Sequence, residues 1–159
     1  MGPQLTIEQR IGVRLAEVGR SVCTAESCTG GLIAHRLTNV SGSSAYFLGG
    51  IVAYSNEAKV RHLGVSQADL DGNGAVSDPV ACEMALGARA AFGADYAVAV
   101  TGIAGPGGGT AAKPVGLVFI AVASAEGVVV SRGQFAGGRE AIKAQTADAA
   151  LEMLWEGLG

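Results

Sequence analysis

A serine among small residues, Ser27 in the stretch ESCTGG (residues 26–31), is the first candidate for chemistry in this chain. A β-prone segment precedes it and a helical period follows it, so Ser27 is predicted at a strand-to-helix junction. The first amides of a helix lack internal acceptors and, with the helix dipole, favour negative charge. A hydroxyl beside them can attack a carbonyl while they hold the oxyanion. Ser27 is therefore a candidate nucleophile, with Thr29, Gly30 and Gly31 as candidate substrate contacts.

The same junction has a simpler interpretation. Serine and threonine are among the preferred N-cap residues, so by capping preferences alone Ser27 or Thr29 is more often a helix cap than a reactive group. The distinction depends on which other side chains the fold brings to this turn.

A serine nucleophile needs a base, and histidine is scarce in this chain. His35 and His62 both fall inside predicted helices, where a histidine is more often a surface or core residue than a base. A lysine can serve when burial lowers its pKa. Lys59 follows a buried strand that ends near Tyr54, which suits an active-site base, although the segment alone would be read as a solvated helix.

A glycine-rich loop, residues 102–110, directly follows another predicted strand. Glycines at this density expose successive amides, which suits a phosphate. The loop is neither a Walker A motif nor a dinucleotide fingerprint, because neither the Gly-Lys-Ser/Thr ending nor a following helix is present. By residue type it could be a linker, but its place at a strand end favours ligand binding. The candidate contacts here are Thr101, Gly102, Gly105, Gly107, Gly108 and Thr110.

Helical and strand patterns alternate along the chain and must position these groups. Apolar spacing predicts an opening helix over residues 5–19, with a capping box at Thr6 and Gln9. Two late strands should form an antiparallel hairpin, so the sheet cannot be purely parallel. The predicted strands are 21–25, 46–54, 95–101, 115–123 and 128–135, and further helices begin at 32, 55, 78 and 138. The predicted fold class is α/β, a three-layer sandwich with a mixed sheet and helices on both faces.

Length and composition limit the class of protein. The 159 residues fit a single domain, 1–159, without repeat or linker. Charged residues make up only 16% of the chain, so we expect surface to be buried in a homo-oligomer, with a dimer as our guess. The net charge of −3 and the lack of a long basic run argue against a nucleic-acid partner. No signal peptide or bilayer-spanning run is recognisable, so we expect a cytoplasmic protein without a membrane partner.

Three cysteines, Cys23, Cys28 and Cys82, are present. An odd number without paired spacing argues against a disulfide framework, and the spacing does not match a zinc site. We expect free thiols in a reducing compartment and predict no metal.

Taken together, three stretches resemble the nicotinamide-nucleotide amidohydrolases, the CinA C-terminal domain family. They are AESCTGGLIAHRLTNVSGSSAYFLGGIVAYSNEAKVRHLGV (25–65), GAVSDPVACEMALGA (74–88) and VTGIAGPGGGTAAKPVGLVFIAV (100–122). Each piece alone is weak, but the combination in this order is specific and covers nearly the whole chain. Such domains often follow a larger domain resembling molybdopterin-binding proteins, so this chain looks like the stand-alone form.

The resemblance implies hydrolysis of the carboxamide of nicotinamide mononucleotide to nicotinic acid mononucleotide and ammonia, in pyridine nucleotide recycling, without a cofactor. It implies Ser27 as nucleophile, Lys59 as general base and Tyr54 as an assisting hydroxyl. Lys59 would accept the serine proton directly or through Tyr54, and amides near Thr29 and Gly30 would hold the oxyanion. The glycine-rich loop and Arg139 are the candidates for phosphate and ribose contacts.

The sequence departs from its relatives at two places. Ala111-Ala112 stands where relatives usually carry an acidic residue, and Lys143 stands where they tend to show a second arginine after Arg139. Lysine keeps the charge but cannot make a bidentate phosphate contact. Two other functions stay open: a catalytically silent nucleotide-binding module and a competence-associated interaction domain.

Overall fold

The protein, described here from a computed structural model that covers residues 2–159, is built on one five-stranded sheet with the strand order β2-β1-β3-β4-β5. The strands are β1 (Val22–Glu26), β2 (Phe47–Val52), β3 (Tyr96–Gly102), β4 (Leu117–Ser124) and β5 (Gly127–Gln134). β1 is parallel to both β2 and β3, whereas β4 is antiparallel to β3 and to β5. The predicted mixed sheet and its late hairpin are therefore confirmed.

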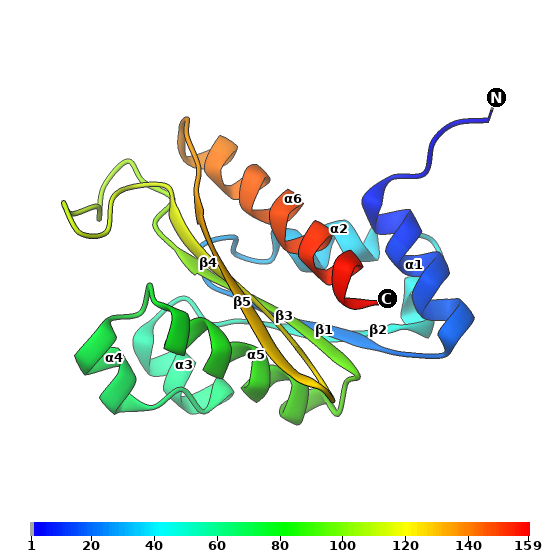
Figure 1. The fold of residues 1–159 in the computed structure, drawn as a ribbon, viewed down its shortest axis with the longest axis horizontal. Helices are drawn as coiled ribbons and strands as arrows, with labels where there is room; N and C mark the ends of the chain where they lie inside the picture. The colour runs from blue at the N-terminus through cyan, green and yellow to red at the C-terminus, as the bar shows by residue number, and fades with distance from the viewer. Residues whose placement is uncertain (1) are drawn as a thin grey trace.

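Helices cover both faces of the sheet (Figure 1). On one face lie α1 (Ile7–Val18), α2 (Leu32–Thr38) and α6 (Arg139–Gly157). The other face carries α3 (Asn56–Leu63), α4 (Gln67–Asn73) and α5 (Asp78–Phe92). A short 3-10 helix, η1 (Ser43–Ala45), precedes β2. This is the predicted three-layer sandwich.

The central strand β3 shows why helices must cover both faces of the sheet. Val98 and Val100 pack into the cluster beneath α1, α2 and α6, while Ala97 and Ala99 belong to the cluster that contains α5. Successive strand residues point to opposite faces, so a strand that is apolar at every position must be buried on both. Alanines on the α5 side leave room for that helix to approach the sheet closely.

Local sequence signals explain where several helices begin. Thr6 and Gln9 form the predicted capping box of α1, and the Ser55 hydroxyl caps α3. Helix α5 starts at Asp78 with proline in its first turn, as the sequence indicates. Helix α4, which the sequence analysis does not predict, follows a Ser66 cap. Among residues 2–159 no helix is long and apolar enough to cross a bilayer.

The glycine pair in β2, Gly49 and Gly50, coincides with an irregularity in the pairing of β1 and β2. Val22 of β1 pairs with Phe47, but the next residue, Cys23, pairs with Gly49, so one residue of β2 is extra. A side chain at Gly49 would collide with Phe92 of α5, and one at Gly50 with Thr24 of β1. The glycines let the edge strand lie close to its neighbours.

Candidate active site

The candidate residues meet where three parallel strands end. Because β1, β2 and β3 run in the same direction, the segments after them emerge at one edge of the sheet, where α/β proteins place their ligands. A pocket of about 290 Å³ lies there. Its lining residues are Ser27, Cys28, Tyr54, Asn56, Lys59, Ala75, Val76, Thr101, Gly102, Ile103, Ala104, Gly105, Gly107, Gly108 and Arg139.

Ser27 follows β1 directly, and Lys59 reaches it from α3. The Lys59 Nζ lies 3.0 Å from the Ser27 Oγ and 3.0 Å from the carbonyl oxygen of Ala53. The Ser27 amide donates to the carbonyl of Val100 on β3 (3.1 Å), which fixes the serine between two strands. The serine hydroxyl and the amine are thus in direct hydrogen-bond contact, without Tyr54 between them.

The Lys59 side chain is buried, with 2% of its surface exposed. Burial in a low-dielectric environment disfavours the charged amine and lowers the pKa of Lys59 below its ordinary value. Within residues 2–159 no carboxylate lies within ion-pair distance of it. An amine whose neutral form is favoured by burial and that touches a serine hydroxyl has the arrangement that a general base requires.

Cys28 also lines the pocket and is the rival nucleophile. Its thiol is 5% exposed, and burial raises the pKa of Cys28 to about 11, so it stays protonated at neutral pH. The neighbouring lysine contacts the serine oxygen instead. The chemistry of the pocket therefore favours Ser27. All three cysteines are free.

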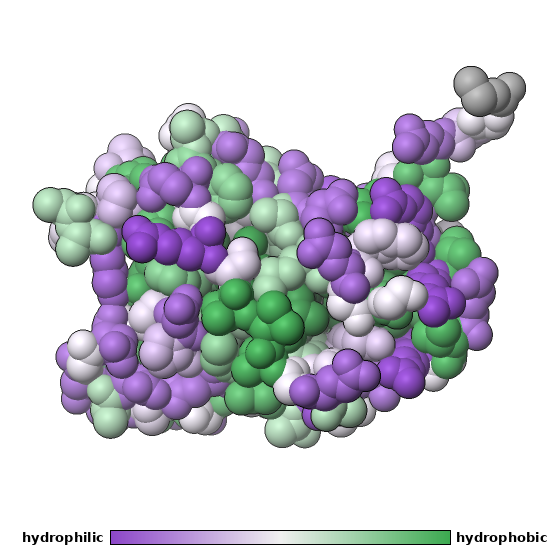
Figure 2. Space-filling model, in the orientation of Figure 1, coloured by the Kyte–Doolittle hydropathy of each residue, from purple (hydrophilic) through white to green (hydrophobic). Residues whose placement is uncertain are grey.

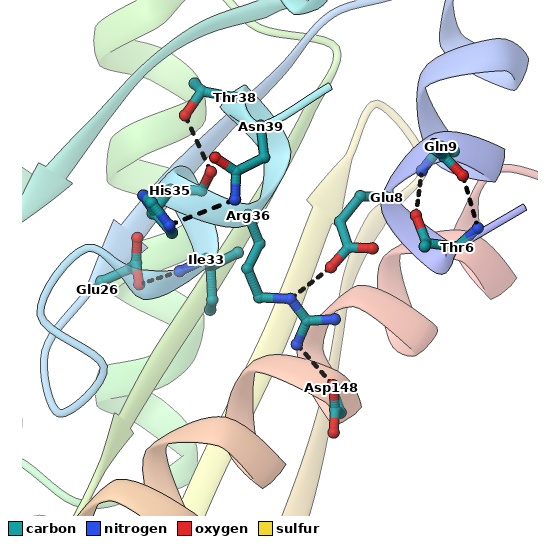
Figure 3. A network of polar contacts seen from close by, with 10 residues as sticks. All are labelled: Thr6, Glu8, Gln9, Glu26, Ile33, His35, Arg36, Thr38, Asn39 and Asp148. Atoms are coloured by element: carbon teal, nitrogen blue, oxygen red, sulfur yellow. Dashed lines mark hydrogen bonds and ion pairs between the residues drawn. The ribbon is translucent and has the colours of Figure 1, made fainter. Parts of the chain in front are cut away.

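The turn after Ser27 depends on the buried carboxylate of Glu26. Its oxygens accept hydrogen bonds from the Thr29 hydroxyl (2.6 Å) and from the amides of Ile33 (2.9 Å) and Ala34 (3.0 Å). The last two are first-turn amides of α2, so a glutamate from the preceding strand caps this helix (Figure 3). Gly31 occupies the N-cap position itself, in a left-handed conformation. The interpretation of Ser27 or Thr29 as the N-cap is therefore wrong.

This capping also corrects the expected oxyanion site. The first amides of α2 do not point outward to a ligand, because Glu26 accepts from them. The Gly30 amide is occupied as well, since it donates to the carbonyl of Ser27 (3.1 Å). Among the described residues, the amides of Cys28 and Thr29 donate to no backbone carbonyl. These two amides, rather than those of the helix, are the candidates for an oxyanion contact beside Ser27.

Helix α2 is held rigidly against two other helices. The Arg36 guanidinium contacts the carboxylates of Glu8 on α1 (2.5 Å) and Asp148 on α6 (2.6 Å), as Figure 3 shows. A planar guanidinium that joins two carboxylates fixes the orientation of all three elements. The turn that carries Ser27 is therefore supported from behind by α1 and α6.

The glycine-rich loop forms the opposite wall of the pocket and is anchored to its surroundings. The Thr101 hydroxyl donates to the carbonyl of Ala75 (2.9 Å), and the Lys113 amine donates to the carbonyl of Asn73 at the end of α4. The loop is followed by β4, not by a helix, as predicted. Both anchors join it to the connection between α4 and α5.

Arg139, the first residue of α6, lies across the mouth of the pocket. Its Nη1 donates to the carbonyl of Gly105 in the glycine-rich loop (2.8 Å), and its Nη2 donates to the Tyr54 hydroxyl (2.6 Å). Tyr54, just beyond β2, is 58% exposed. The Arg139 guanidinium supplies positive charge at the pocket, and neither aspartate nor glutamate is among the residues that line it. The pocket therefore suits an anionic ligand.

Some predicted contacts lie elsewhere. Thr29, Gly30, Gly31 and Thr110 do not line the pocket, so their contact with substrate stays a prediction. Thr110 instead accepts from the Lys113 amide (3.0 Å) and helps to close its own loop. Conversely, the sequence analysis did not predict a site role for six of the lining residues: Cys28, Asn56, Ala75, Val76, Ile103 and Ala104. The last four are apolar and carry no chemical signal of their own.

We find no group of three or more metal-ligating side chains within residues 2–159 that could hold a metal ion. His35 and His62 do not line the pocket. The chemistry that this arrangement can perform is nucleophilic attack by Ser27 with Lys59 as the base.

Known proteins resemble this chain in sequence and in fold. The sequence matches the family described as the CinA C-terminal domain over residues 4–158. It is 48% identical over 153 residues to the nicotinamide-nucleotide amidohydrolase PncC of Escherichia coli K12, covering 96% of this chain and 93% of that protein. It is 53% identical to a putative competence-damage inducible protein of Moorella thermoacetica, but spans only 37% of the length of that protein.

A solved structure extends the agreement to the fold. The competence/damage inducible protein CihA from Agrobacterium tumefaciens superposes with a TM-score of 0.93 at 46% sequence identity, and the match covers 98% of both chains. The chain therefore belongs to the CinA C-terminal domain family.

Proposed function

We propose that this protein hydrolyses the carboxamide of nicotinamide mononucleotide to nicotinic acid mononucleotide and ammonia, a step of pyridine nucleotide recycling. The observation that carries the proposal is the 3.0 Å contact between the Lys59 Nζ and the Ser27 Oγ inside a pocket. The identity of 48% to the nicotinamide-nucleotide amidohydrolase PncC supports the choice of substrate.

In the first half of the reaction, neutral Lys59 accepts the proton of the Ser27 hydroxyl. The serine oxygen attacks the carboxamide carbon, and the amides of Cys28 and Thr29 stabilise the negative charge that develops on the carbonyl oxygen. The Lys59 ammonium then donates its proton to the departing nitrogen, so ammonia leaves and an ester of Ser27 remains.

In the second half, water hydrolyses the ester. Lys59, neutral again, takes a proton from the water as it attacks the ester carbon, and it returns that proton to the Ser27 oxygen when the acid departs. One water is consumed and one ammonia is released, and the protein regains its starting state. The assisting role of Tyr54 stays a prediction, because the direct contact between Lys59 and Ser27 does not require it.

Ammonia release from nicotinamide mononucleotide by the wild type, Ser27→Ala and Lys59→Ala tests this function. We expect wild-type turnover and a loss of about 10³-fold or more in both variants. Unchanged rates in either variant would remove that residue from the mechanism. Affinity for the mononucleotide without ammonia release from the wild type would favour the silent binding module instead.

We also infer a homodimer. β5 is an edge strand, and Figure 2 shows apolar surface gathered over it, between α5 and α6. Val129 on β5 and Leu86 on α5 are exposed by 66% and 45%. Such a surface on a free strand edge favours association. Light scattering coupled to gel filtration measures the mass, and a strictly monomeric particle would contradict the inference. The expected cytoplasmic location likewise stays a prediction.

A further inference from the structure

We propose that Thr29 is a positioning residue of this active site: its side chain, anchored on the carboxylate of Glu26, fixes the two peptide groups whose amides we assign to the oxyanion. The proposal rests on the proposed function, because it names what orients the oxyanion donors of the same reaction. It gives the Thr29 side chain a part in the rate of the chemical step, in place of a contact with the substrate.

The backbone of the turn does not fix these peptide groups by itself. The Ser27 carbonyl accepts from the Gly30 amide (3.1 Å), but the amides of Cys28 and Thr29 donate to no backbone carbonyl among the described residues. The two residues that follow, Gly30 and Gly31, have positive φ values of 60° and 106°. Glycine has the greatest backbone freedom of all residues, so a side chain is needed to hold this turn in one conformation.

The Thr29 hydroxyl supplies the anchor. It donates to the Glu26 Oε1 over 2.6 Å, and Thr29 is buried, with 1% of its surface exposed. A bond of this length from a hydroxyl to a carboxylate is among the stronger hydrogen bonds in proteins. Threonine is β-branched and stiff about χ1, so a fixed hydroxyl also fixes the backbone of the residue. A hydroxyl that donates inside the protein is not available to a substrate, and its use is therefore positional.

The carboxylate of Glu26 is itself fixed from two sides. Its oxygens also accept from the amides of Ile33 (2.9 Å) and Ala34 (3.0 Å) on α2, and its backbone carbonyl accepts from the Ala53 amide (2.9 Å) beyond β2. Glu26 directly precedes the nucleophile, so the nucleophile and the anchor of the turn belong to one rigid unit. Donors that are in place before the reaction need no reorganisation when charge develops, and small displacements of them lower the rate.

The first test measures the rate of ammonia release from nicotinamide mononucleotide. Thr29→Val replaces the hydroxyl by a methyl group, so the contact with Glu26 is lost while the amides of α2 keep their acceptor. We expect kcat to fall about tenfold, less than the loss of a whole oxyanion donor, because the amides are displaced and not removed. KM should stay within about twofold of wild type. Thr29→Ser keeps the hydroxyl, and its kcat should stay within about threefold of wild type.

Thr146→Val is the matched control. Thr146 on α6 is also fully buried, its hydroxyl donates to the carbonyl of Ile142 (2.7 Å), and it does not line the pocket. The variant loses a buried hydrogen bond of the same kind, but kcat should stay within about twofold of wild type. Equal falls of kcat in Thr29→Val and Thr146→Val would indicate general destabilisation and would overturn the proposal.

The second test measures binding at the oxyanion site and needs no turnover. The probe is the pyridine-3-carbaldehyde analogue of nicotinamide mononucleotide, in which an aldehyde replaces the carboxamide. The Ser27 oxygen adds to the aldehyde carbon, the π pair of the carbonyl moves to its oxygen, and Lys59 takes up the serine proton. A tetrahedral oxyanion thus forms without a leaving group. The Kd of the aldehyde should rise about tenfold in Thr29→Val and stay within about threefold of wild type in Thr29→Ser.

The ground-state ligand provides the reference. In a Ser27→Ala background, calorimetric titration gives the Kd of nicotinamide mononucleotide with and without Thr29→Val. This Kd should stay within about twofold, because the carbonyl oxygen of the bound carboxamide carries no full charge. An equal rise of Kd for the aldehyde and the mononucleotide would show a distorted pocket and would overturn the positioning role.

These readouts separate the proposal from the proposed function. A rise in the Kd of the aldehyde alone supports the positioning role of Thr29 even if the wild type releases no ammonia. An aldehyde affinity that Thr29→Val does not change, absence of binding included, overturns the role whatever the wild-type activity is.

Discussion

Two ionisable side chains, Glu26 and Lys59, are buried close to Ser27, and their surroundings differ. Glu26, at the turn between β1 and α2, is 1% exposed and accepts three hydrogen bonds. Lys59, on α3, is 2% exposed and contacts two neutral oxygens, those of Ser27 and Ala53. The glutamate is surrounded by donors that suit its charge, whereas the lysine lacks an opposite charge.

The difference indicates two different uses of a buried ionisable group. A carboxylate that satisfies a hydroxyl and two helix amides stabilises the fold, because each of those donors would otherwise be buried without a partner. A buried lysine without a carboxylate partner contributes little to the stability of the fold, because burial favours its neutral form. That neutral form is useful only for accepting a proton. Glu26 therefore stabilises the turn, and Lys59 is placed to accept a proton from the serine in that turn.

The largest expected effect separates activity from stability at Lys59. Lys59→Met keeps the apolar length of the side chain and removes the base, so hydrolysis should fall by about 10³-fold or more. The free energy of unfolding in urea at pH 7 should stay equal to that of the wild type or rise, because an unpaired buried amine is replaced by an apolar group. A loss of several kcal/mol would instead make Lys59 a structural residue.

Glu26→Gln should act in the opposite way to Lys59→Met, because its main effect should be on the free energy of unfolding. The amide group is similar in shape, but it offers one acceptor oxygen, so its nitrogen would face a donor that the carboxylate now accepts from. We expect a loss of about 2–3 kcal/mol in the free energy of unfolding, from one unsatisfied donor and a weaker interaction with the start of α2.

The control for Glu26→Gln is Glu152→Gln, an exposed carboxylate on α6 without an ion pair among the described residues. It should change the free energy of unfolding by less than about 0.5 kcal/mol. Equal small shifts in the two variants would show that Glu26 is not needed to cap α2.

Much of the fold could be predicted from the sequence because it depends on local signals. The capping box at Thr6, the proline after Asp78 and the hairpin near residue 125 each act within a few positions. Their pattern predicts the mixed sheet and the helices on both faces. Helix α4 was missed since its seven residues bury a single side chain, Leu70, which leaves no apolar period to detect.

The site could be predicted only in part. Ser27, Lys59 and the glycine-rich loop each follow a strand, and parallel strands bring such segments together. The role of Glu26 was not predicted, because serine and threonine are the usual caps and a glutamate that reaches forward by seven residues is not a local motif. The contact between Tyr54 and Arg139 joins two loops across the pocket, and no spacing in the sequence encodes it.

The smallest effect, and the sharpest test of the comparison, is the dependence on pH. Burial lowers the pKa of Lys59 in the folded protein, whereas the unfolded value is about 10.4. Between these two values the unfolded state binds the additional proton, so stability rises with pH in that window and falls as pH drops through the folded pKa. The slope is at most about 1.4 kcal/mol per pH unit, since one proton is involved.

The rate should follow the same titration. Since Lys59 must be neutral to accept the Ser27 proton, kcat/KM should rise with pH and level off above the folded pKa of Lys59. The difference in unfolding free energy between wild type and Lys59→Met should bend at that same pH, because a single group governs both quantities. Urea unfolding and ammonia release, each measured between about pH 6 and 10, give the two curves. If they bend at clearly different pH values, the group that limits the rate is not the buried lysine.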